Sequence, residues 1–255
     1  GQTSDPTTGA RALPLYQTTA YQFRDTTHAA NLFGLAELGN IYTRIMNPTQ
    51  GVLEERIAAL EGGTAALAVA SGHAAEFLIF HTIMQPGDEF ISANKLYGGS
   101  INQFNHAFKN FGWNVVWADP DDLSSFERAV TPKTRCILVN SPSNPTGAVY
   151  TRKELEAIVA VALRHNLYIL SDEMYEHLVY DDARPTCVAT FSPEVAARTI
   201  TVAGFSKTYA MTGWRIGYVA GPSRIVKAID ALMTQTTSNP SSIAQWAAVE
   251  ALDGP

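Results

Sequence analysis

Few cysteines, few charged residues and no long apolar run characterise this 255-residue sequence. Its cysteines, Cys136 and Cys187, are far apart and lack metal-site spacing, so we expect free thiols in a reducing compartment and no metal site. Lysines and arginines form no cluster, and the formal net charge of -6 argues against nucleic-acid binding. No apolar run is long enough to span a membrane, and the start shows no signal-peptide pattern. The sequence therefore predicts a cytoplasmic protein that binds neither nucleic acid nor membrane.

The composition favours a well-buried core, because 46% of the residues are hydrophobic and only 16% are charged. Apolar, β-branched runs alternate with helical patterns, which predicts an α/β fold with a mostly parallel sheet between two helix layers. Residues 1–50 are polar and predict an irregular, extended arm, and residues 51–255 predict one large domain. Strands are expected at residues 64–70, 88–93, 113–117, 135–140, 167–171, 199–202 and 218–221.

Lys207 follows one of these expected strands, next to Ser206 and eight residues before Arg215. Open α/β sheets bind ligands at such strand ends. Our hypothesis is that Lys207 forms a Schiff base while Ser206 and Arg215 hold a phosphate. The alternative is an ordinary pair of exposed basic side chains. A nucleotide P-loop is excluded, because Ser206 stands where that motif needs glycine before the lysine.

Two further strand ends carry features of a binding site. Ser71, Gly72 and His73 open a helix, and free backbone N–H groups at a helix start favour phosphate. We expect His73 to contribute its backbone N–H rather than act as a base. Tyr97 precedes two glycines, so its ring could stack on an aromatic cofactor or fill a gap in the core.

The next two strands are followed by an amide and a carboxylate. Asn144 is fixed by Pro145 and could donate to a ligand oxygen, or it could belong to a plain turn. Asp172 would be costly to bury without a positive partner, such as a metal or a protonated ring nitrogen, although it could also cap a helix. Tyr175 should lie near Asp172 in a turn.

Tyr42 and Arg44 are two residues apart in a segment expected to be extended. Alternate residues of an extended chain point the same way, so both side chains could reach one anion, or they could form a plain surface pair.

Three motifs in the second half resemble class I aminotransferases of the aspartate aminotransferase kind. They occur in the family's order and spacing, and this resemblance covers about residues 136–255. The motifs are Ser143-Asn144-Pro145-Thr146-Gly147, Ser171-Asp172-Glu173-Met174-Tyr175, and Phe205-Ser206-Lys207 through Gly213-Trp214-Arg215-Ile216-Gly217.

The first part, to about Thr134, instead resembles O-acetylhomoserine sulfhydrylases of the Cys/Met metabolism family. Because the two parts resemble different families, the chain looks like a chimera joined near residues 135–140. Both families belong to the fold-type I pyridoxal-phosphate (PLP) superfamily, so a junction there could preserve the sheet. Both families continue into a small domain with a carboxylate-binding arginine, which we expect to be absent because the chain stops at Pro255. The resembling segments include Asp5 to Arg11, Tyr42 to Thr49, Leu60 to Gly63, Ser71 to Ala75 and Leu96 to Ser100.

The resemblance to aminotransferases implies roles around PLP. Lys207 would form the internal aldimine and act as general acid–base at the substrate Cα. Asp172 would pair with the pyridine nitrogen, while Tyr175 and Asn144 would bond the phenolic oxygen. Ser206 and Arg215 would hold the phosphate.

The resemblance to sulfhydrylases supplies the remaining roles. Gly72 and His73 would add backbone donors to the phosphate, and Tyr97 would stack on the ring. Tyr42 and Arg44 would reach the phosphate of a neighbouring subunit, which implies a homodimer.

These roles predict a PLP-dependent transferase acting on an amino acid as its small-molecule substrate, with aminotransferase-type chemistry. One alternative is sulfhydrylase-type γ-replacement. Another is a truncated or engineered domain that binds PLP with little or no turnover, because the carboxylate-binding arginine is expected to be missing.

Overall fold

A seven-stranded sheet forms the centre of the computed structural model, which describes residues 4–254. The first three residues of the predicted arm, and Pro255, lie outside the described residues. The strand order is β1-β7-β6-β5-β4-β2-β3, and every predicted strand is present to within two residues at each end. The strands are β1 (Ala66–Val69), β2 (Glu89–Ala93), β3 (Asn114–Ala118), β4 (Thr134–Asn140), β5 (Tyr168–Asp172), β6 (Thr199–Gly204) and β7 (Gly217–Ala220).

The sheet is mostly parallel, as predicted. Strands β3, β2, β4, β5 and β6 pair in parallel, whereas β7 runs antiparallel to both β6 and β1. A parallel return needs a crossover helix, but only short helical turns separate β6 from β7. Because β7 alone is reversed, β1 runs in the same direction as β6. The carboxyl ends of six strands therefore meet at one edge of the sheet.

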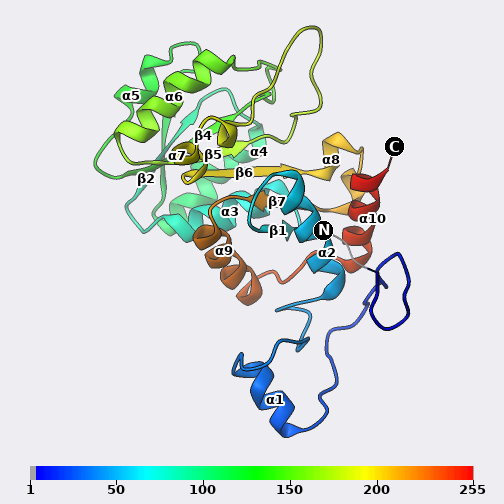
Figure 1. Ribbon diagram of the computed structural model, residues 1–255. Coiled ribbons are helices and arrows are strands. Elements are labelled where there is room, and N and C mark those ends of the chain that lie inside the picture. Colours follow the sequence, from blue (N-terminus) through cyan, green and yellow to red (C-terminus); the bar gives the residue numbers. More distant parts are fainter. Residues whose placement is uncertain (1–3, 255) are drawn as a thin grey trace.

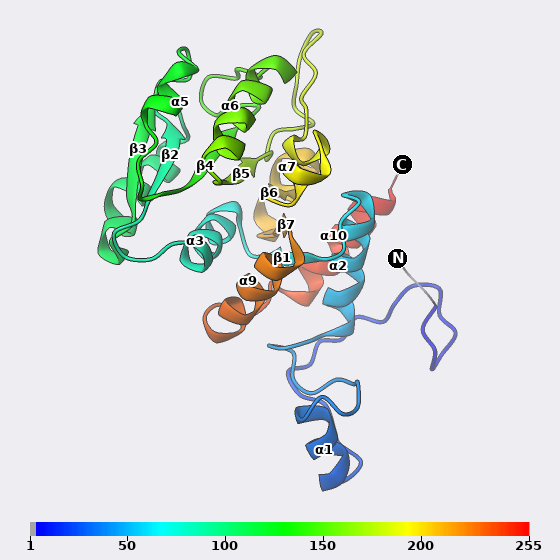
Figure 2. The same ribbon diagram turned by 60° about the vertical axis from the view of Figure 1, so that its left-hand side comes forward.

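Helices cover both faces of the sheet, which confirms the predicted three-layer arrangement (Figures 1 and 2). One face carries α3 (Gly72–Ile83) and α9 (Ser223–Gln235), and the other carries α5 (Ser124–Arg128), α6 (Arg152–Arg164) and α7 (Pro193–Ala196). Strand β4 shows why two layers are needed. Its Cys136 and Leu138 belong to the core on the α3 side, and its Ile137 and Val139 belong to the core on the α6 side.

A third apolar cluster joins the helices beside β1. Here α2 (Pro48–Leu60) packs on α10 (Ser242–Asp253) and on the strand. Leu53 and Ile57 of α2 contact the face of β1 that carries Ala66 and Ala68. This packing holds the helix that follows the arm and the last helix of the described chain against the same edge of the sheet.

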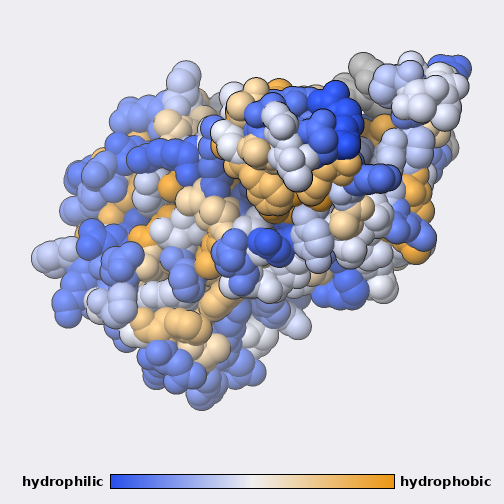
Figure 3. All heavy atoms as spheres, turned by 90° about the horizontal axis from the view of Figure 1, so that it is seen from below, coloured by the Kyte–Doolittle hydropathy of each residue, from blue (hydrophilic) through white to orange (hydrophobic). Residues whose placement is uncertain are grey.

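The N-terminal arm is less irregular than predicted, because it contains helix α1 (Thr26–Phe33). The carboxylate of Asp25 caps this helix by accepting the N–H of His28 at 2.7 Å. The α1 segment projects away from the sheet in both ribbon views (Figures 1 and 2). Seen from below, apolar residues gather on this projecting segment (Figure 3).

The prediction of an extended segment around Tyr42 and Arg44 was also wrong in part. Tyr42 forms a single bridge with Ala20, but the chain then turns, and the N–H of Ile45 donates to the Tyr42 carbonyl. The two side chains nevertheless lie together, since the Arg44 guanidinium is 5.8 Å from the Tyr42 ring centroid. No helix within residues 4–254 is both long and apolar enough to cross a membrane.

Candidate active site

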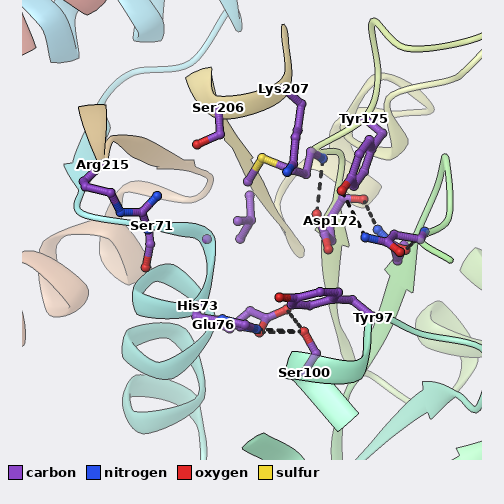
Figure 4. A pocket seen from close by; sticks show the side chains of 15 residues that line it. Ser71, His73, Glu76, Tyr97, Ser100, Asp172, Tyr175, Ser206, Lys207 and Arg215 are labelled. Carbon is purple, nitrogen blue, oxygen red and sulfur yellow. Dashed lines mark hydrogen bonds and ion pairs between the residues drawn. The ribbon is translucent and has the colours of Figure 1, made fainter. Parts of the chain in front are cut away.

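One cavity of about 230 Å³ gathers side chains from the carboxyl-terminal edge of the sheet (Figure 4). All predicted site residues except Tyr42 and Arg44 line it. The lining residues are Ser71, Gly72, His73, Glu76, Tyr97, Ser100, Asn140, Asn144, Asp172, Met174, Tyr175, Val202, Ser206, Lys207 and Arg215.

The sheet explains why residues so distant in sequence meet. Ser71 follows β1, Tyr97 follows β2, Asn144 follows β4, Asp172 ends β5, and Lys207 follows β6. These strands run in the same direction, so their ends open on one edge. The cavity is therefore a direct consequence of the strand order.

Lys207 lies in a single helical turn, α8 (Phe205–Thr208), that begins directly after β6. Its side chain extends into the cavity towards Tyr175, and its Nζ lies 5.6 Å from the centroid of that ring (Figure 4). The turn starts at Gly204, where an added Cβ would lie 3.2 Å from the Cα of Gly217. This close approach of β6 and β7 fixes the position of the backbone from which the Lys207 side chain extends.

Asp172 lies on the right of the cavity in Figure 4, and its Oδ1 accepts the N–H of Met174 at 3.2 Å. Burial raises the pKa of its carboxyl to about 6, although the Met174 and Asn140 hydrogen bonds oppose this shift. Asp172 precedes a turn rather than a helix, so the helix-cap alternative does not hold. Within residues 4–254 no basic side chain forms an ion pair with it. It is thus mostly ionised at neutral pH and suited to a cationic ligand atom.

Asn144 and Tyr175 form a polar pair beside Asp172. The side-chain amide of Asn144 donates to the Tyr175 hydroxyl at 3.0 Å, and its backbone N–H donates to Asn140 Oδ1 at 3.0 Å. These bonds orient the amide and the phenol at the same wall, where both could bond one ligand oxygen.

The opposite end of the cavity suits an anion. The Ser71 hydroxyl caps α3 by accepting the Ala74 N–H at 3.1 Å, and the next residues, Gly72 and His73, occupy the first turn of the helix. Arg215 lies beside Ser71 at this end of the cavity, and its guanidinium points towards that side chain (Figure 4). A helix N-terminus and a guanidinium together favour a phosphate.

Tyr97 lies on the side of the cavity opposite Lys207 (Figure 4). Its ring stacks on His73, with centroids 5.5 Å apart and planes 27° apart. Gly99, in α4 (Gly98–Asn102), leaves no room for a Cβ beside these two rings. The His73 side chain therefore supports the Tyr97 platform, a contact that the sequence did not predict.

Three buried polar residues of the cavity were missed from the sequence, Glu76, Ser100 and Asn140. Glu76 lies one helical turn after His73, which could have signalled a shared face. Tyr42 and Arg44 do not line this cavity. Arg44 instead donates to the Thr234 carbonyl at 3.1 Å.

The combined features fit a flat aromatic cofactor that carries a phosphate and a protonated ring nitrogen. Lysine, carboxylate, aromatic platform and anion site lie on separate walls, so they do not compete for one position. Among the described residues there is no group of three or more histidine, cysteine, aspartate or glutamate side chains able to hold a metal ion.

The model of the Cys/Met metabolism PLP-dependent enzyme family matches residues 1–179. It therefore runs past the predicted junction near residues 135–140, and the two-parent origin stays a prediction. An O-acetyl-L-homoserine sulfhydrylase of Leptospira meyeri is 52% identical over 145 residues, which cover 57% of this chain and 33% of that protein. An aspartate aminotransferase of Geobacillus stearothermophilus is 41% identical over 185 residues, which cover 70% of this chain and 46% of that protein.

Similarity to solved structures extends over nearly the whole chain. A structure titled as an O-acetylhomoserine (thiol)-lyase from Campylobacter jejuni, which contains N′-pyridoxyl-lysine-5′-monophosphate, has a TM-score of 0.78 at 26% identity. The match covers 99% of this chain and 68% of that one. By contrast, the sequence matches cover only 33% of the Leptospira meyeri sulfhydrylase and 46% of the Geobacillus stearothermophilus aminotransferase, so the chain spans a third to a half of the length of these relatives.

Proposed function

Because this chain belongs to the family of Cys/Met metabolism PLP-dependent enzymes, we propose that it is a transferase of aminotransferase type that acts on an amino acid. PLP is the cofactor of the family, and the fold is that of fold-type I PLP enzymes. The observation that carries the proposal is the convergence of Lys207, Asp172 and the Asn144–Tyr175 pair on one cavity.

PLP, when bound, supplies an electron sink that stabilises negative charge at the amino-acid Cα. Lys207 would attach the cofactor and then carry the proton that leaves and returns at Cα. Asp172 would keep the ring nitrogen protonated, and the Asn144–Tyr175 pair would bond the phenolic oxygen.

The phosphate would be held at the other end of the cavity. Arg215 and Ser206 would contribute side-chain donors, while Gly72 and His73 would contribute backbone N–H groups. Tyr97 would cover one face of the ring and limit the access of water.

The hypothesis of aminotransferase-type chemistry rests on where the reactive residues lie in the chain. Lys207, Asp172, Tyr175, Asn144 and Arg215 all lie in the part of the chain that resembles aminotransferases. We also propose that this part and residues 1–134 derive from two parents, and the similarity of the chain to both a sulfhydrylase and an aminotransferase supports this.

Sulfhydrylase-type γ-replacement is the second candidate, and the family match over residues 1–179 favours it. A domain that binds PLP with little turnover is the third. These candidates share the cofactor site and differ in what happens to the substrate.

The cofactor site is tested by adding PLP, reducing with borohydride and mapping the label by mass spectrometry. We expect the label on Lys207 and its loss in Lys207→Ala. The matched control is Lys153→Ala, which removes an exposed lysine of α6 and should leave labelling unchanged. Equal labelling of Lys207→Ala and wild type would show that the cofactor site is wrong.

The reaction is tested on the PLP-loaded protein with L-aspartate or L-glutamate. Transamination predicts stoichiometric pyridoxamine phosphate and the matching oxo acid. Homocysteine formed from O-acetylhomoserine and sulfide would instead support γ-replacement. Stable PLP labelling with neither product would support the third candidate.

A further inference from the structure

Glu76 is a buried carboxyl on the wall of the cavity with no role in the chemistry described above. Only 4% of its surface is exposed, and it lies on α3 one turn after His73. Figure 4 shows Glu76, His73 and Ser100 grouped on the side of the cavity opposite Lys207. An ionised carboxylate in such a place is costly unless a cation or several donors compensate it.

The hydrogen bonds around Glu76 supply little compensation. The Ser100 hydroxyl lies 3.3 Å from both carboxyl oxygens, but its one proton serves only one of them. Ser100 is also 3.3 Å from His73 Nε2, so the three side chains form a chain of possible proton donors and acceptors. A protonated Glu76 can donate to Ser100, which can then donate to His73.

The charged groups facing the cavity give Glu76 no firm cationic partner. Within residues 4–254, the one basic group in ion-pair range is His73, whose Nε2 lies 3.9 Å from Glu76 Oε2. Burial lowers the pKa of His73, which keeps that ring neutral at pH 7. Asp172 faces the cavity from β5, Lys207 from α8, and Arg215 from the segment before β7.

We propose that Glu76 is a positioning residue that holds a proton at neutral pH, so that Asp172 alone presents negative charge to the cofactor ring. This role rests on the proposed PLP-dependent function. If both carboxylates were ionised, the site would hold two negative charges for the single positive charge of the ring nitrogen. A neutral Glu76 leaves one carboxylate for one ring proton.

The electrostatics of the pair agree with this role. Burial, and next the charge of Asp172, raise the pKa of Glu76 to about 8, against the lowering effect of the Ser100 hydrogen bond. Asp172 therefore ionises first and Glu76 second, as expected for coupled carboxyls. If Glu76 only connected α3 to α4 through its hydrogen bond to Ser100, the order in which Glu76 and Asp172 ionise would not matter.

Whether Glu76 holds a proton is tested by NMR on the full chain without PLP, with carbon-13 in the glutamate carboxyl groups. The carboxyl resonance that disappears from the spectrum of Glu76→Gln is assigned to Glu76. We expect it to titrate above pH 7, and in Asp172→Asn we expect its midpoint to move to lower pH. A midpoint near 4, the ordinary glutamate value, would overturn the proposal, as would no movement in Asp172→Asn.

The consequence for the cofactor is tested by PLP affinity at pH 7. Glu76→Gln keeps a neutral hydrogen-bonding group and should stay within about twofold of wild type, whereas Glu76→Ala should lose about tenfold. Glu54→Gln is the matched control, because Glu54 is a half-buried carboxyl of α2 outside this cavity and also has a raised pKa. A tenfold loss in Glu76→Gln as well would mean that the ionised carboxylate is needed, and the proposal would fail.

The two tests separate the inference from the proposed function. If wild type binds no PLP, the proposed function fails, whereas the carboxyl titration still decides whether Glu76 holds its proton. If PLP binds and Glu76 titrates near 4, the inference fails and the proposed function stands.

Discussion

Four carboxyl groups, from β5, α2, α3 and the turn after β5, share one electrostatic property. Burial raises the pKa of Asp172 to about 6, of Glu54 and Glu173 to about 7, and of Glu76 to about 8. Each has hydrogen-bond donors, such as Gln50 and the Ala68 N–H for Glu54, but these only partly offset the loss of water. The interior therefore favours the protonated forms and makes the stability of the fold depend on pH.

Stability should fall as the pH rises from 5.5 to 8. In this window the folded protein binds more protons than the unfolded chain, because its carboxyl pKa values are raised, so the free energy of unfolding decreases with pH. His73 has a lowered pKa and opposes this trend, but it is a single group. Urea unfolding of the PLP-free protein measures the effect.

Glu54→Gln should weaken this dependence. For Glu54 alone, a rise from 4.5 to about 7 corresponds to about 3 kcal/mol at pH 8. The variant should therefore match wild type near pH 5 and exceed its stability at pH 8. Stability that stays constant or rises between pH 5.5 and 8 in wild type would contradict the prediction.

Residues of the site were predictable where a strand ends in an unusual side chain. Lys207, Asp172 and Asn144 each follow an apolar run, and the parallel sheet brings such positions together. Glu76 and Ser100 were not predictable in this way, because they lie on helices and become part of the cavity only through the packing of α3 on α4.

At the level of elements, the antiparallel direction of strand β7 could not be predicted from the sequence. Its alternation and length are those of any short buried strand, and nothing in the residues specifies direction. Direction follows from the short connection after β6, and glycines let the two strands approach closely. A Cβ on Gly217 would lie 3.1 Å from the carbonyl oxygen of Ala203.

Gly217→Ala should therefore push β7 away from β6. The nearest atoms are backbone, which cannot rotate aside, so we expect a loss of about 1–3 kcal/mol in unfolding free energy. PLP affinity should fall as well, because the end of β6 positions Lys207. Both are measured on the same preparation, by urea unfolding and by PLP titration.

Gly51→Ala is the control for this substitution. Gly51 lies in helix α2, and an added Cβ there meets nothing within 4 Å, so the change should stabilise the protein slightly. If Gly217→Ala behaves like Gly51→Ala, the close approach of the strands does not constrain the site.

The helices and strands were otherwise predicted well by periodicity and capping residues. The Thr-x-x-Glu pattern of Thr151 and Glu154 is typical of a capping box, and it starts α6. Helix α1 was missed because it has one capping residue and contributes a single fully buried side chain, Leu32. A short helix outside the core leaves little trace in the hydrophobic pattern.

At the scale of the molecule, the cavity depends on both parts of the chain that show separate resemblances. His73 and Tyr97 come from the first part, and Asp172 and Lys207 from the second. Strand β4, where the predicted junction lies, pairs in parallel with β2 on one side and with β5 on the other. A junction there would keep the sheet continuous and bring the two sets of residues to one edge.

The projecting arm gives the last expectation. Phe33, Leu35 and Leu38 are 64%, 78% and 93% exposed, and this apolar surface extends from the projecting α1 segment. Tyr42 and Arg44 follow on the same arm but do not line the cavity of their own chain. A second copy of the chain would cover the apolar residues and receive this pair near its own phosphate site.

We therefore expect a homodimer in analytical ultracentrifugation, and Phe33→Ser with Leu38→Ser should shift it to monomer. Arg44→Ala should keep the dimer and lower PLP affinity about tenfold, because one cationic contact to the phosphate is lost. Leu178→Ser, at another exposed apolar residue outside the arm, is the control and should change neither property. A monomeric wild type that binds PLP as tightly as Arg44→Ala would show that the arm completes no neighbouring site.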